Sequence, residues 1–287
     1  MEDLIFAEVI ERGPYRYGLK LRWNYQDTVI EETLYFYGNS PRVDVRFVTD
    51  WKEDQIFLKA LFPLELNTTE ATFEIQYGNV KRSTAYNTSW DQARFEVCHH
   101  KWMDVSEGGY GVSFLNDCKY GVSVEENVVG LSLIKSGNYP NPTADREHHQ
   151  AVYSVLPHLG TWKEAGTVKE AYLLNNPLQA VAGRKAAAGN CIQKCEDFPQ
   201  RYGLVRASGR NIMIETIKQA EDGSDTVVRL YEFENTQSQV ELTLARTAKR
   251  IWIGNLMEEK QTLVAAETDR CSLVVKPFEI VTIMIEF

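Results

Sequence analysis

The richest cluster of chemically active side chains lies in a polar loop with two prolines, residues 138–149. This loop contains Arg146, His148 and His149, and it leads into a strand-like run at residues 151–156. Charged residues gathered on a loop above a sheet are where binding sites are commonly built. The loop could therefore present a guanidinium and imidazoles to a polar ligand.

A second polar segment, residues 115–121, follows an apolar run and contains a predicted turn. The turn brings Asp117, Lys119 and Tyr120 close together, so a carboxylate, an ammonium and a phenol could act on one ligand. The same residues are also typical turn chemistry, with Asp117 capping the backbone and Lys119 in solvent. Spacing alone favours this structural interpretation.

The five histidines do not follow a metal-binding pattern. A zinc site needs three or four converging ligands, and two ligands on one strand must be two residues apart, because successive side chains point to opposite faces. The pairs at residues 99–100 and 148–149 are each adjacent. We therefore expect no metal site in this chain, and we find no Ser-His-Asp order and no nucleotide-binding glycine loop.

The elements that must hold these residues are almost all strand-like. Polar and apolar residues alternate with a period of two at residues 15–23, 33–37 and 43–48, and a turn cluster at 38–41 separates two of these runs. This pattern is typical of antiparallel strands with one buried face. Hardly any window keeps a helical period for three turns, so an all-β fold is predicted.

Composition changes between residues 175 and 190, where small and polar residues leave little to bury. Strand patterns resume at residues 204–207 and continue to 280–285. A chain of 287 residues favours two domains in any case. We predict a large β domain at residues 1–182 and a smaller β-sandwich at residues 183–287.

Charge and cysteine content exclude several partners. The chain has 31 basic and 40 acidic residues and a formal charge of −9, which repels nucleic acids and anionic membranes. No window approaches the roughly 20 apolar residues that span a bilayer. The five cysteines are scattered and odd in number, so they predict no disulfide framework and a reducing, cytoplasmic location. We expect no nucleic-acid partner and no membrane partner.

An ordered series of short motifs runs along nearly the whole chain. It consists of residues 50–53, 58–63, 74–78, 87–97, 102–107, 110–112, 115–121, 153–158, 228–232 and 276–282. Together these motifs resemble the C-terminal β-domain region of glycoside hydrolase family 38 α-mannosidases. The resemblance implies a large antiparallel supersandwich, similar to the galactose mutarotase type, followed by a smaller β-sandwich.

The resemblance also implies a function for the complete enzyme. Family 38 α-mannosidases are retaining glycosidases in which zinc grips the sugar hydroxyls, an aspartate is the nucleophile and a second carboxylic acid protonates the leaving oxygen. These groups belong to an N-terminal catalytic domain and a helical segment, and the family's zinc-binding His-x-Asp pair has no counterpart here. We therefore expect no catalytic residue and no cofactor in this chain, and no turnover without the catalytic domain. The expected partners are that catalytic domain and mannose-containing glycans.

The resemblance assigns a supporting role to the two polar segments. Asp117, Lys119 and Tyr120 match the family's Asn-Asp-x-Lys-Tyr-Gly motif, so they are expected at the rim of the substrate cleft or at the domain interface. Arg146, His148 and His149 fall in a segment similar to the family's Asp-x-Gly-x-His pattern. They are assigned the same role, although a glutamate stands where glycine is common.

Two other functions and one assembly remain open from the sequence. A free-standing carbohydrate-binding module could use a sheet face and some of the six tryptophans, although large aromatics are more often core in a β-sandwich. A mutarotase-like enzyme would need a histidine and a carboxylate acting as acid and base. A surface normally covered by the catalytic domain would also favour homo-oligomers.

Overall fold

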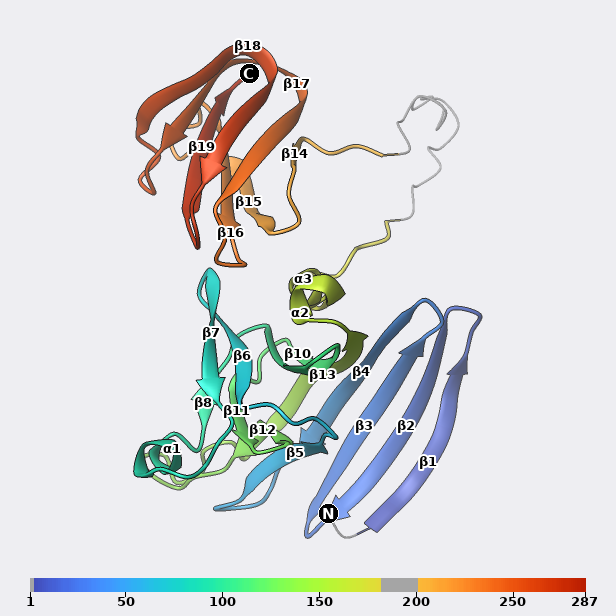
Figure 1. The fold of residues 1–287 in the computed structure, drawn as a ribbon. Helices are drawn as coiled ribbons and strands as arrows, with labels where there is room; N and C mark the ends of the chain where they lie inside the picture. The colour runs from blue at the N-terminus through green and yellow to red at the C-terminus, as the bar shows by residue number, and fades with distance from the viewer. Residues whose placement is uncertain (1–2, 182–200) are drawn as a thin grey trace, which may run out of the picture. The chain divides into compact units, whose positions relative to one another are not determined.

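The computed structural model describes residues 3–181 and 201–287, which form two compact units (Figure 1). The first unit extends to Leu178, and the second begins at Gln179. The domain boundary predicted between residues 182 and 183 lies outside the described residues.

The first unit is built around a nine-stranded antiparallel sheet (Figure 1). Its strands, in order across the sheet, are β1 (Asp3–Arg12), β2 (Arg16–Tyr25), β3 (Thr28–Tyr37), β4 (Ser40–Asp50), β13 (His148–Leu159), β10 (Tyr110–Asn116), β9 (Trp102–Glu107), β6 (Glu70–Ile75) and β7 (Gly78–Ser83). The two-residue period predicted β2, β3 and β4 of this sheet correctly. In β4, for example, Val45 and Phe47 are buried while Arg46 between them is exposed.

A second, four-stranded sheet packs against the first one. It contains β5 (Phe57–Pro63), β12 (Val128–Lys135), β11 (Gly121–Glu125) and β8 (Val97–Cys98). Three short helices accompany the sheets: α1 (Ser89–Ala93), α2 (Trp162–Ala165) and α3 (Thr167–Asn175). None of the helices in the described residues is long and apolar enough to cross a membrane. The predicted all-β fold is thus confirmed.

Two apolar clusters fill the space between these sheets. One joins Phe73, Met103 and Phe114 of the large sheet to Val122 and Val129 of the small sheet. The other is formed by the following residues of both sheets and their connections: Ile30, Val45, Phe47, Trp51, Leu131, Leu133, Ile134 and Tyr153. Each fully buried large side chain contributes about 1.5–3 kcal/mol, so this contact between layers holds the first unit together.

The second unit contains one antiparallel sheet that folds into a sandwich. Its strands are β14 (Val205–Ala207), β17 (Ser238–Gly254), β19 (Ile280–Glu286), β16 (Thr226–Glu232) and β15 (Ile212–Gln219), and β18 (Lys260–Val275) pairs with β17. The register of β17 against β18 shifts between Thr243 and Ala248. Before this shift β17 pairs with β14, and after it β17 pairs with β19. The irregularity therefore lets the long β17–β18 hairpin contribute to both layers of the sandwich. β-Bulges bend strands in the same way in other sheets.

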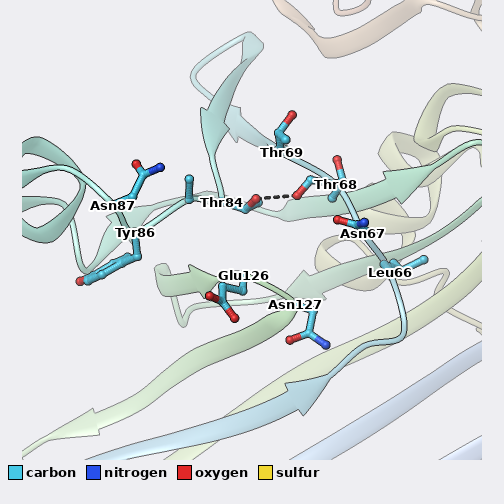
Figure 2. A pocket seen from close by; sticks show the side chains of 10 residues that line it. Leu66, Asn67, Thr68, Thr69, Thr84, Tyr86, Asn87, Glu126 and Asn127 are labelled. Carbon is cyan, nitrogen blue, oxygen red and sulfur yellow. Dashed lines mark hydrogen bonds between the residues drawn. The ribbon is translucent and has the colours of Figure 1, made fainter.

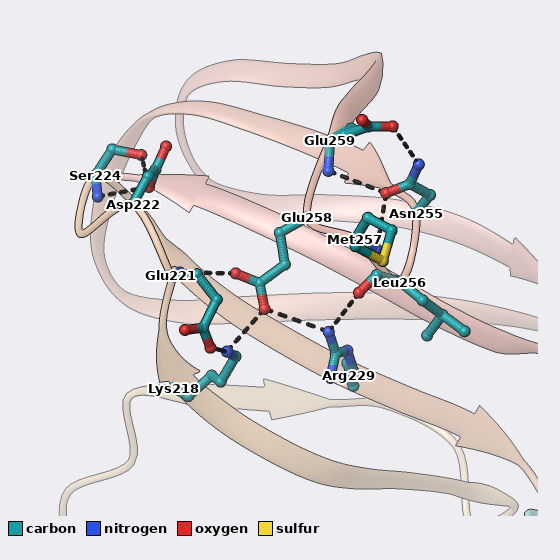
Figure 3. Close-up of polar contacts among 10 residues, drawn as sticks. All are labelled: Lys218, Glu221, Asp222, Ser224, Arg229, Asn255, Leu256, Met257, Glu258 and Glu259. Atoms are coloured by element: carbon teal, nitrogen blue, oxygen red, sulfur yellow. Dashed lines mark hydrogen bonds and ion pairs between the residues drawn. The ribbon is translucent and has the colours of Figure 1, made fainter.

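A polar network joins two strands of the second unit to a turn (Figure 3). The carboxylate of Glu258 accepts a hydrogen bond from the backbone N of Glu221 at 2.8 Å and pairs with Lys218 Nζ at 2.8 Å. Arg229 Nη2 lies 3.3 Å from the same carboxylate and donates to the carbonyl oxygen of Leu256 at 3.0 Å. The network fixes the 255–259 turn on the surface, where such ion pairs contribute little.

Candidate functional site

The turn after β10 is built around Asn116, whose side chain is fully buried. Its Nδ2 donates to the carbonyl oxygen of His100 at 2.7 Å, and its Oδ1 accepts from the backbone N of Lys119 at 2.8 Å. The amide also donates to Nε2 of His99 at 2.9 Å. The buried side chain of Asn116 therefore fixes the backbone conformation of the 116–120 segment.

His99 completes this turn from the inside. Its Nδ1 donates to the carbonyl oxygen of Tyr120 at 3.1 Å, while its Nε2 accepts from Asn116. Burial lowers the pKa of His99 to about 4, so the ring is neutral near pH 7. His99 is a structural residue that shapes the turn, and neither ring nitrogen is available to a ligand.

Asp117 is tied to the neighbouring strand. Its backbone N donates to the carbonyl oxygen of Val152, and its Oδ1 accepts from the backbone N of Val152, both at 3.0 Å. Tyr120 is 46% exposed, and its ring centroid lies 5.8 Å from that of His100. The ammonium of Lys119 and the phenol of Tyr120 therefore remain for contacts with a ligand or a partner, whereas the carboxylate of Asp117 fixes the turn.

The loop before β13 makes its own set of contacts. Arg146 Nη2 pairs with Asp54 Oδ2 at 2.7 Å, and His148 Nδ1 lies 2.7 Å from Asp50 Oδ1. His149 Nε2 donates to the carbonyl oxygen of Asp145 at 2.7 Å. Two exposed carboxylates, which sequence reasoning missed, therefore accompany the predicted arginine and histidine. Their signal was the charged segment at residues 50–54, which begins at the last residue of β4.

The sheet topology places both polar segments at one end of three neighbouring strands. Strand β4 ends where β13 begins, because His148 pairs with Asp50, and β10 ends beside the middle of β13, because Asn116 pairs with Tyr153. His149 and Val152, the anchor of Asp117, are three positions apart along β13, which corresponds to about 10 Å. We call this set of six predicted residues, Asp117, Lys119, Tyr120, Arg146, His148 and His149, the rim.

Lys119 and Tyr120 offer an ammonium and a phenol at the rim, whereas its other four side chains are bonded to neighbouring groups. Within residues 3–181 and 201–287, no group of three or more histidine, cysteine or acidic side chains could hold a metal ion. The described residues therefore do not fit the zinc ion of the resemblance.

A buried histidine–carboxylate pair lies away from the rim. His158 of β13 reaches across β10 to Asp104 of β9, and its Nε2 donates to Asp104 Oδ2 at 2.8 Å. The crossing passes Gly111, where a Cβ atom would lie 2.6 Å from His158 Cε1. Ser113 Oγ donates to the same carboxylate at 2.8 Å. Both partners are buried, so the pair braces three strands and does not present an acid and a base to a sugar.

A surface hollow of about 600 Å³ lies elsewhere in the first unit (Figure 2). Amide, hydroxyl, carboxylate and phenol groups line it: Asn67, Thr69, Tyr86, Asn87, Glu126 and Asn127. Thr84 Oγ1 donates to the carbonyl oxygen of Thr68 at 2.6 Å, which ties the two walls together. The volume lies within the range of about 300–1,000 Å³ for small-molecule sites, and the lining suits a neutral polar ligand.

Two family models match the chain. Residues 3–143 match the glycosyl hydrolases family 38 C-terminal domain, and residues 211–283 match the glycosyl hydrolases family 38 C-terminal beta sandwich domain. The first match lies within the first unit and the second match within the second unit. The chain therefore belongs to the C-terminal region of glycosyl hydrolase family 38.

The curated relatives of this chain are named as alpha-mannosidases. Alpha-mannosidase 2C1 of Homo sapiens is 36% identical over 248 residues, covering 84% of this chain and 23% of the relative. Alpha-mannosidase G of Dictyostelium discoideum is 34% identical over 285 residues, covering 96% of this chain and 26% of the relative. The chain thus spans about a quarter of the length of these relatives.

A solved structure shares the fold. The crystal structure of an alpha-mannosidase from Enterococcus faecalis V583 superposes with a TM-score of 0.78 at 16% identity, covering 99% of this chain and 35% of that protein. At this identity the similarity shows the fold alone. It supports the predicted supersandwich followed by a smaller sandwich.

Proposed function

We propose that this chain is the C-terminal, non-catalytic part of a retaining α-mannosidase that hydrolyses terminal α-mannosyl residues. The observation that carries the proposal is the match of both units to the C-terminal domains of one glycosidase family. The chain completes and stabilises the active-site cleft of a catalytic domain, and it has no turnover alone. Zinc and the catalytic carboxylates are assigned to that domain, and a cytoplasmic location is assigned to the assembled enzyme.

The rim and strand β1 are the surfaces proposed to meet the catalytic domain. Lys119 and Tyr120 offer an ammonium and a phenol beside the mannose-binding cleft. Strand β1 exposes four large apolar residues, Leu4, Ile5, Val9 and Ile10, although strands normally bury one face. Covering this strand in the complete enzyme would remove the exposed apolar surface. In its absence the same strand favours self-association.

The test measures hydrolysis of a chromogenic α-mannoside in the presence of zinc or cobalt. The chain is assayed alone and after mixing with a separately produced N-terminal catalytic part. Activity is expected only in the mixture, and size-exclusion chromatography is expected to show a complex. Activity of the chain alone would overturn the proposal that this chain is the non-catalytic part of the enzyme.

A carbohydrate-binding module is the second candidate, and the hollow of Figure 2 favours it. Amides and carboxylates bind sugar hydroxyls, and the ring of Tyr86 offers a stacking face. Calorimetric titration of the chain with mannose oligosaccharides, without any partner domain, tests this candidate. Saturable binding that weakens in the Tyr86→Ala and Glu126→Ala variants is expected for a module. Binding that neither variant changes argues against the hollow as the site.

A further inference from the structure

Two arginines line one small, partly enclosed cavity in the first unit. The cavity has a volume of about 40 Å³, and residues of β6, β7, β11 and the α1 segment surround it. Arg82 comes from β7, and Arg94 is the C-cap residue of α1. The cavity shares Ala85 and Tyr86 with the hollow of Figure 2, but neither arginine lines that hollow.

Arg82 is partly buried in the wall of this cavity. Its Nη1 is buried and has no hydrogen-bond partner among the described residues. Its central carbon lies 4.6 Å from the ring centroid of Phe73, a cation–π contact that satisfies no N–H group. Burial lowers the pKa of Arg82, which shows that its surroundings disfavour the charge. A buried, unpartnered charged donor is costly unless something binds it.

The carboxylates near the cavity are engaged elsewhere. Asp91 lines the cavity, but its Oδ2 accepts from the backbone N of Thr88 at 3.1 Å and from Thr88 Oγ1 at 2.6 Å. Glu96, two residues after Arg94, is bonded to Lys59 and Ser132. Two arginines and one carboxylate, that of Asp91, line the cavity, so its local charge is positive in a chain whose net charge is −9.

We propose that this cavity binds a small oxyanion, a phosphate or carboxylate group, between Arg82 and Arg94. The planar fork of a guanidinium matches both groups, and two arginines supply enough donors for one anion. One water molecule needs roughly 10–15 Å³ of such a cavity, so a volume of about 40 Å³ admits a small ionic group and no larger ring system. The anion would satisfy the buried Nη1 of Arg82.

Calorimetric titration of the whole chain with inorganic phosphate at constant ionic strength tests the proposal. Saturable binding at one site is expected, with at least tenfold weaker affinity in Arg82→Gln and in Arg94→Gln. Arg46→Gln is the matched control, because Arg46 is an exposed arginine of the same sheet. Its affinity is expected to equal that of the wild type. Equal affinity in Arg82→Gln, or no saturable binding at all, overturns the proposal.

Two further measurements test whether a lower affinity is caused by a folding defect and identify the source of the anion. Phosphate is expected to raise the thermal unfolding midpoint of the wild type but not that of Arg82→Gln. Each protein is compared with and without phosphate, so the two proteins need not be equally stable. Glycerol phosphate then distinguishes a free ion from a group on a larger molecule. Binding of both compounds assigns the site to a phosphate carried by a larger molecule, and binding of inorganic phosphate alone assigns it to the free ion.

Discussion

His158 donates a hydrogen bond from Nε2 to Asp104 Oδ2 over 2.8 Å, and it does so across an intervening strand. Burial by itself lowers the pKa of His158, but the hydrogen bond and charge of Asp104 outweigh burial, so the net pKa is raised. A raised pKa means that the pair stabilises the protein while His158 is protonated. The contribution is fully present below about pH 6.5, the value of a free histidine, and it is lost as the pH rises through the folded-state pKa.

We expect the stability difference between the wild type and His158→Gln to be largest below pH 6.5 and to shrink at higher pH. Urea unfolding at several pH values measures this difference. Asp104→Asn removes the charge and is expected to destabilise the protein most below pH 6.5, where a protonated His158 would be left buried without its carboxylate. A difference that stays constant with pH would contradict the assigned ion pair.

His99 is expected to show the opposite pH dependence. Its pKa of about 4 is lower than the value of about 6.5 for a free histidine. The native state therefore loses stability as the pH falls from about 6.5 towards 4, by about 2 kcal/mol between pH 7 and pH 5. His99→Gln is expected to be less stable than the wild type at pH 7 but to lose less stability on acidification. Urea unfolding at the two pH values checks this, and an equally steep loss in the variant would contradict the prediction.

The two histidines also show what the sequence could not reveal. The two-residue period predicts which face of a strand is buried, and Val45 and Phe47 follow that prediction. His158 and Asp104, in contrast, are 54 residues apart, and they meet because the register places Gly111 between them. A glycine within a strand signals close approach, but it does not say which side chains approach.

The rim illustrates the same limit. The sequence located both polar segments, because turn residues and charges cluster there. It left Asp117 open as either a capping residue or a site residue, and the structure shows its carboxylate bonded to the backbone of Val152. The acidic partners Asp50 and Asp54 depend on the alignment of β4 with β13, and strand order is a long-range property that local patterns do not carry.

Glu232 is expected to be the most sensitive polar residue of the second unit. It is fully buried, and it accepts from Asn211 Nδ2 at 2.8 Å and from the backbone N atoms of Glu234, Thr236 and Phe278 at 2.7–3.1 Å. Glu232→Gln places an amide NH₂ against these donors, so we expect a loss of about 3 kcal/mol or more. Glu241→Gln, at an exposed position on β17, is the control and is expected to change stability by less than about 0.5 kcal/mol.

Thermal unfolding followed by calorimetry measures the effect of Glu232→Gln. The transition of the second unit is expected to move to lower temperature, while the transition of the first unit stays in place. Equal midpoints for Glu232→Gln and Glu241→Gln would show that the four contacts contribute nothing net.

Lys119 and Tyr120 provide the test of the rim in the assembled enzyme, and this prediction depends on the proposed α-mannosidase function. Both side chains are expected to contact substrate outside the reacting centre, so Lys119→Met and Tyr120→Phe should raise KM severalfold with little change in kcat. A tenfold change in kcat/KM corresponds to about 1.4 kcal/mol of transition-state binding. Lys169→Met, at an exposed position of α3, is the matched control and should leave both constants unchanged. Equal unfolding midpoints for all three variants exclude a folding effect. An unchanged KM in both rim variants would show that the substrate does not contact this end of the sheet.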